Sequence, residues 1–119
     1  MLSPTSLFRI SVGLALGQCV LLSGARAESN AQGMREALVG VSAYAACKRI
    51  HAGYSQTRAD RIVATAIEQN NWTAQKSWLR SPQAVQTIKL VSEAMNPECS
   101  DFNQDSPQFI PAMKAIDAL

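Results

Sequence analysis

Few side chains of this 119-residue sequence could carry out chemistry: one histidine, three cysteines and scattered carboxylates. A hydrolytic triad would need His51 to be oriented by an acid and aimed at a serine, but the sequence contains no G-x-S-x-G elbow. A zinc site would need several histidine or free cysteine ligands. Asp60, Glu68 and Glu93 fall on polar faces of predicted helices, so no catalytic carboxylate pair is expected. The sequence therefore predicts no enzyme, no cofactor, no metal site and no small-molecule substrate.

The first 27 residues have the pattern of a secretory signal peptide. An apolar run of about 13 residues, shorter than the roughly 20 of a membrane-spanning helix, leads to Ala25-Arg26-Ala27, which fits the A-x-A cleavage rule. We therefore expect a signal peptide over residues 1–27 and a single helical domain over residues 28–119, periplasmic or secreted. Cys19 leaves an alternative, because a lipoprotein leader also ends at a cysteine. Only in that case, as an outer-membrane lipoprotein, would the protein contact a membrane.

The predicted leader also accounts for the formal net charge of +2. Without Arg9 and Arg26, the chain has equal numbers of basic and acidic residues. A neutral domain without clusters of arginine or lysine offers no electrostatic footprint for nucleic acid. Nucleic acid is therefore excluded as an expected partner.

Cys47 and Cys99 form an even pair once Cys19 is assigned to the leader. In a chain exported to an oxidising compartment, such a pair predicts a disulfide. Closing a loop of this length would stabilise the fold by about 4 kcal/mol in the chain-entropy model. A redox or nucleophilic role is the alternative, but the two cysteines are far apart, no C-x-x-C motif exists, and a disulfide leaves no thiolate.

The spacing of apolar residues predicts helices throughout the domain, and no alternating β-branched run predicts a strand. Caps, asparagines and prolines mark the helix boundaries. We expect helices from Met34 to near His51, from a capping box at Thr57 to Asn70-Asn71, in short turns from Thr73 to Leu79, from Ser81-Pro82 to Asn96-Pro97, and from Ser106-Pro107 or Ile110 onward. The predicted fold is all-α, a small four-helix bundle, orthogonal or up-down, with one disulfide.

Several large apolar side chains lie outside the main stripes of these helices. Val39 and Ile50 fall opposite the stripe of the first helix, and Leu90 points away from the stripe of its own helix. Some of this surplus belongs to the core, but a small bundle with such residues also commonly presents a groove for an amphipathic helix. The predicted partner-binding residues are Val39, Ile50, Trp78, Leu79 and Leu90.

Over residues 38–113 the chain resembles the helical pilotins of type II secretion systems, which escort secretin subunits to the outer membrane. The similarity lies in Tyr44 before Cys47, in an alanine-rich helix that ends at Asn71-Trp72, and in the segments Cys99-Ser100-Asp101-Phe102-Asn103 and Pro107-Gln108-Phe109. The resemblance implies a four-helix bundle pinned by Cys47 and Cys99. It also implies a groove that takes the C-terminal segment of a secretin as that segment folds into a helix.

Two protein partners follow as hypotheses. The resemblance favours a periplasmic pilotin-like module that binds a secretin segment. The alternative is an immunity or inhibitor protein that blocks a periplasmic cell-wall hydrolase, because small disulfide-pinned helical proteins also serve that role.

Overall fold

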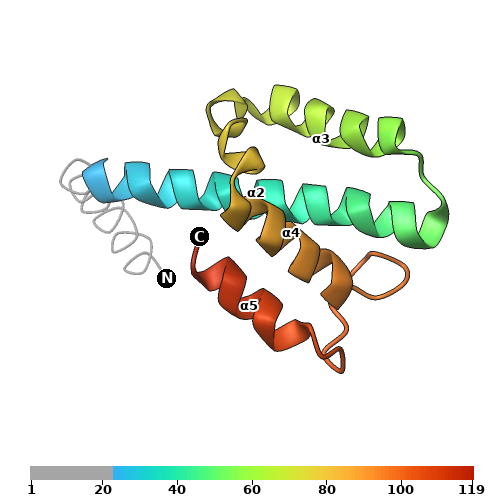
Figure 1. Cartoon of the computed structure of the whole chain (residues 1–119). Coiled ribbons are helices and arrows are strands. Elements are labelled where there is room, and N and C mark those ends of the chain that lie inside the picture. Colours follow the sequence, from blue (N-terminus) through green and yellow to red (C-terminus); the bar gives the residue numbers. More distant parts are fainter. Residues whose placement is uncertain (1–22) are drawn as a thin grey trace, which may run out of the picture. The chain divides into compact units, whose positions relative to one another are not determined.

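The computed structural model describes residues 23–119, with side chains from residue 31 onward (Figure 1). The chain divides into two compact units, Met1–Ala31 and Gln32–Leu119. Of the first unit, only the helical backbone of residues 23–31 is described. Most of the predicted signal peptide, including Cys19, therefore lies outside the described residues.

The described chain is helical. Its elements are α2 (Ser23–Ala52), α3 (Gln56–Asn70), the short 3-10 helices η1 (Thr73–Gln75) and η2 (Trp78–Arg80), α4 (Pro82–Ala94) and α5 (Phe109–Asp117). No strand occurs among residues 23–119, where the only β-type pairing is an isolated bridge between Met95 and Phe102. The all-α prediction is confirmed. None of the helices described has an apolar stretch of the length that a bilayer crossing requires.

Helix α2 is buried on two sides, as its two apolar stripes predict. Val39 and Ala43 face a core shared with α4 and α5, while Leu38 and Ala45, also buried, lie on the opposite side, toward α3. The helix ends at Ala52 before a glycine with φ of +72°, as expected, but it begins well before the predicted start at residue 34. No proline occurs within Ser23–Ala52, and the helix is continuous over this range.

The start of α3 corrects the predicted cap. Ser55, not Thr57, is the N-cap, and its hydroxyl accepts a hydrogen bond from the backbone amide of Arg58 at 3.1 Å. Asn71 ends the helix as predicted, in the left-handed conformation with φ of 60°. Helix α3 buries only Ala59 and Ile67, so most of its apolar stripe keeps some contact with solvent.

The chain between α3 and α4 makes two 3-10 turns, in the region where the sequence predicts short turns. Thr73 is the first residue of η1, and no side-chain hydrogen bond caps either turn. Trp78 of η2 packs against the core, and the Arg35 guanidinium lies 5.2 Å from its ring centroid. Arg35 also donates a hydrogen bond from Nε to the side chain of Gln75 at 3.2 Å.

Helix α4 begins as the sequence predicts. The hydroxyl of Ser81 accepts from the amide of Ala84 at 3.2 Å, and Pro82 occupies the first turn. Leu90 lies off the apolar stripe of α4, but it still packs against the core cluster. This is possible because α4 has packed neighbours on more than one side. The buried hydroxyls of Thr87 and Ser92 donate to carbonyl oxygens of their own helix at 2.7 and 2.8 Å, so neither is left unpaired.

The core lies between α2, α4 and α5 and is built largely from small side chains. Ala43, Ala94 and Ala112 come from the three helices and are completely buried, which allows the helix backbones to approach closely. Helix α5 begins at Phe109, and Pro111 stands in its first turn, where its missing amide would have had no intrahelical partner. Helix α3 contributes no buried residue to this cluster.

Candidate functional site

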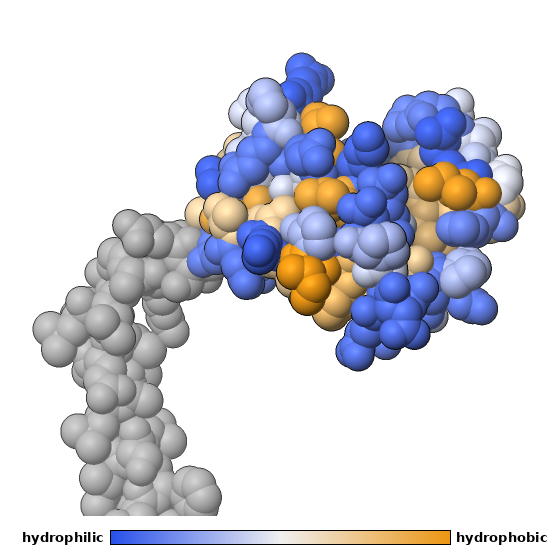
Figure 2. Space-filling view, turned by 60° about the horizontal axis from the view of Figure 1, so that its bottom comes forward, coloured by the Kyte–Doolittle hydropathy of each residue, from blue (hydrophilic) through white to orange (hydrophobic). Residues whose placement is uncertain are grey.

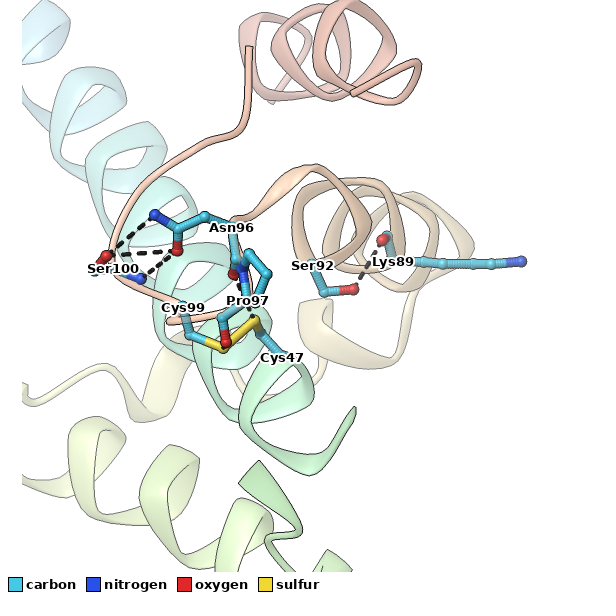
Figure 3. Close-up of a disulfide and its surroundings, with 7 residues drawn as sticks. All are labelled: Cys47, Lys89, Ser92, Asn96, Pro97, Cys99 and Ser100. Atoms are coloured by element: carbon cyan, nitrogen blue, oxygen red, sulfur yellow. Dashed lines mark hydrogen bonds between the residues drawn. A yellow bond between two sulfur atoms is a disulfide. The ribbon is translucent and has the colours of Figure 1, made fainter. Parts of the chain in front are cut away.

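The predicted disulfide between Cys47 and Cys99 is confirmed (Figure 3). It joins α2 to the loop after α4, and both residues are buried, at 0% and 3% exposure. The Sγ atom of Cys47 lies 3.6 Å from the carbonyl oxygen of Asn96. Since both sulfurs are bonded to each other and shielded from solvent, neither can act as a thiolate nucleophile.

The loop that holds Cys99 is closed by backbone and side-chain hydrogen bonds. The Asn96 amide donates to the Asp101 carbonyl, and the Cys99 amide donates to the Asn96 carbonyl, each at 2.9 Å. The Asn96 side-chain oxygen also accepts from the amide of Ser100 at 3.0 Å (Figure 3). Cys99 has a φ of 59°, an unusual conformation for a residue with a side chain, and these bonds help to hold it there. The disulfide is therefore part of a tightly bonded loop.

His51 lies exposed in the last turn of α2, where the sequence places it. An imidazole at this position suits the negative end of the helix dipole. Among the described residues, no group of three or more histidine, cysteine, aspartate or glutamate side chains could hold a metal ion.

The five predicted partner-binding residues do not converge on one surface. Val39 is only 1% exposed and belongs to the core, so its predicted place in an open groove is corrected. Trp78 and Leu90 are half-buried and pack against the same core. Ile50 is 65% exposed near the end of α2, and Leu79 lines a hollow beside α3. The sequence predicts partner binding on the side of α2 that carries Val39. At Val39, this side is covered by α4 and α5.

A hollow with a volume of about 440 Å³ lies along α3. Its apolar part consists of Val41 from α2 with Ile62 and Ala66 from α3. The rest of the hollow is lined by polar side chains of α3: Arg58, Arg61, Thr65, Gln69 and Asn70. We call this hollow the α3 groove.

The α3 groove exists because α3 is incompletely covered. Its lining residues recur every three or four positions and so form one stripe along the helix, beside the narrower stripe that buries Ala59 and Ile67. Ile62 and Ala66 remain half-buried, and only Val41 of α2 joins them in the groove. An apolar stripe with this much exposure is a surface on which a further helix could pack.

Arg58 is held at the mouth of the α3 groove by an aromatic ring. Its guanidinium lies 3.6 Å from the ring centroid of Tyr54, which precedes the Ser55 cap. The Tyr54 amide in turn donates to the carbonyl of Lys48 at 3.3 Å and so fixes the turn between α2 and α3. The stacked guanidinium has a defined position beside the apolar stripe.

A second hollow, of about 350 Å³, lies on the other flank of α3. It is lined by Val63 and Ile67 of α3, by Leu79 and Arg80 of η2, and by charged residues of both signs, including Asp60. Of the predicted partner-binding residues, Leu79 lines this hollow. The mixed charge distinguishes this hollow from the α3 groove.

The large apolar side chains exposed elsewhere are scattered. They are Tyr44 and Ile50 on α2, Val85 on α4 and Ile110 on α5. On the face shown in Figure 2, hydrophobic residues form separate patches between hydrophilic ones. No continuous apolar surface appears on that face, so the hollows beside α3 are the better candidates for binding.

Comparison of the chain with protein-family models, with curated proteins and with solved structures gave no match. The candidate site therefore rests on the geometry of the chain itself.

The amino-acid sequence contains a partial signal for the α3 groove. The stripe containing Ile62 and Ala66 is evident from its spacing, but spacing alone does not show that the stripe stays half-covered. No local signal marks Arg58 and Arg61 as site residues, because their place at the edge of this stripe depends on how α3 packs against its neighbours.

Proposed function

We propose that this chain is a periplasmic protein-binding module of the pilotin kind, a four-helix bundle that takes an amphipathic segment of a secretin as a helix along α3. The observation that carries the proposal is the α3 groove, because its half-buried apolar stripe is the feature that an amphipathic helix would cover. The buried disulfide supports folding in an oxidising compartment. The pilotin resemblance supplies the identity of the partner.

This proposal changes the groove that the sequence suggests. The apolar contact is assigned to Val41, Ile62 and Ala66 in place of Val39 and Leu90, which belong to or pack against the core. A secretin segment that is disordered when free would fold as it covers this stripe, and such coupled folding needs no catalytic group.

The test is co-purification of the exported protein with the C-terminal segment of the secretin from the same genome. Ile62→Asp places a charge in the apolar part of the groove and should reduce capture at least tenfold, while far-UV circular dichroism shows unchanged helicity. Val85→Asp is the matched control, since Val85 is 56% exposed on α4 and lines none of the hollows beside α3. Capture that is equal in both variants and in the wild type would reject the groove.

Leu79→Asp maps the binding surface further. Leu79 lines the hollow on the opposite flank of α3, so this variant should bind the secretin segment as the wild type does. Loss of capture in Leu79→Asp but not in Ile62→Asp would move the binding surface to that second hollow.

A further inference from the structure

Positive charge is concentrated at one end of the α3 groove. Arg58 and Arg61 line it, and no acidic residue does. Both arginines lie in the first two turns of α3, whereas Gln69 and Asn70 line the other end with uncharged amides. The groove therefore has a basic end, an apolar middle and a neutral polar end.

The acidic residue closest in sequence does not neutralise this end. Asp60 lies on the other flank of α3, where it lines the second hollow. Its carboxylate accepts a hydrogen bond from the side chain of Gln56 at 2.7 Å. The charge of Arg58 and Arg61 is thus available to a bound partner.

The position of Arg58 suits recognition of a carboxylate. With one face of the guanidinium on the Tyr54 ring, the N–H groups at its edges remain able to bind a carboxylate in the plane of the group. Less side-chain entropy is lost on binding, because the stacked group is already ordered. Arg61, one turn further along α3, adds a second positive charge on the same side.

We propose that the α3 groove binds an amphipathic helix of about three turns whose last turn carries acidic side chains. The lining residues from 58 to 70 span about 18 Å of α3, which is the length of such a helix. A partner running antiparallel to α3 would set the negative end of its own dipole beside the two arginines. This inference rests on the proposed function and adds the charge and the direction of the partner.

The experiment compares two synthetic 14-residue peptides with the same apolar stripe. One carries two glutamates in its last turn, and the other carries two lysines there. Fluorescence anisotropy with the exported protein should give a dissociation constant at least tenfold lower for the glutamate peptide, a difference of about 1.4 kcal/mol. The preference should shrink when the salt concentration is raised from 50 to 500 mM, because the arginines are exposed to solvent.

Variants of the protein test whether the two arginines cause this preference. Arg58→Glu/Arg61→Glu should reverse it, and circular dichroism should show retained helicity, since a carboxylate is favoured in the first turn of a helix. Lys89→Glu/Lys114→Glu is the matched control: it makes the same change in net charge at exposed positions that line none of the hollows beside α3. This control should keep the preference for the glutamate peptide.

The outcomes separate this inference from the proposed function. Equal binding of the two peptides, tighter binding of the lysine peptide, or no binding of either would overturn the inference. So would a preference that is unchanged in Arg58→Glu/Arg61→Glu. If the wild type still captured the secretin segment in any of these cases, and Ile62→Asp did not, the proposed function would stand with a partner of different charge.

Discussion

Val39 and Ile50 share one apolar side of α2 in the sequence pattern, yet their surroundings differ completely. Val39 is 1% exposed and packs against residues of α4 and α5, whereas Ile50 is 65% exposed. The spacing places both residues correctly around the helix, but only the packed structure shows where α4 and α5 stop covering it. At the residue scale, periodicity therefore predicts on which side of a helix a residue lies, but not how far that residue is buried.

A matched pair of truncations tests this difference. Val39→Ala removes two methyl groups from a close-packed core and should lower the free energy of unfolding by about 2 kcal/mol. Ile50→Ala should change it by no more than about 0.5 kcal/mol, because the removed atoms are mostly in solvent. Urea unfolding followed by circular dichroism measures both values. Similar losses in the two variants would show that the end of α2 is covered by contacts absent from the structure.

At the scale of elements, the helix boundaries were predictable where a single local signal decides them. Ser81-Pro82 and Asn71 act as their residue types predict. The sequence pattern alone does not locate the start of α3, because two hydroxyl residues, Ser55 and Thr57, both precede the apolar stripe, and the choice between them depends on the turn after Gly53. The α3 groove was not predictable, since no local signal reports how completely one helix covers another.

The N-cap of α4 can be tested against a serine nearby in the chain. Ser81→Ala removes the hydroxyl that accepts from the Ala84 amide and should cost about 1 kcal/mol of stability. Ser77→Ala is the control, because Ser77 precedes η2 but its side chain makes no capping hydrogen bond. Its effect should stay within about 0.5 kcal/mol. Chemical denaturation measures the free energy of unfolding of both variants. An equal loss of stability in the two would contradict the assignment of Ser81 as the N-cap.

Helices α3 and α4 should differ in local stability. Helix α3 buries two of its 15 residues, whereas α4 buries five of its 13. Local opening requires less free energy where fewer apolar contacts are lost, so amides in the middle of α3 should exchange with deuterium faster than those of α4. Hydrogen exchange followed by mass spectrometry measures this directly. Equal protection of the two helices would mean that α3 opens only with the whole domain, and would weaken the case for an incompletely covered binding surface.

At the scale of the whole molecule, the loop closed by the disulfide contains α3, which contributes no buried residue to the core cluster. Cys47 and Cys99 are 52 residues apart, and the loop between them contains α3, both 3-10 helices and α4. A cross-link over so many residues restricts the unfolded chain strongly, while the core between α2, α4 and α5 supplies much of the packing. The cross-link therefore stabilises the folded state of the whole domain, including α3, in addition to the contacts of the core.

Removing this bond should therefore cost more than any single side chain considered above. Cys47→Ala/Cys99→Ala eliminates both sulfurs together, so that no buried thiol is left unpaired, and should lower the free energy of unfolding by about 4 kcal/mol. Urea unfolding of the variant against the oxidised wild type gives the difference, and wild type kept in excess reductant should lose a similar amount. The variant should be insensitive to reductant, which is the internal control. A loss below about 1 kcal/mol would mean that restricting the unfolded chain contributes little to the stability of this domain.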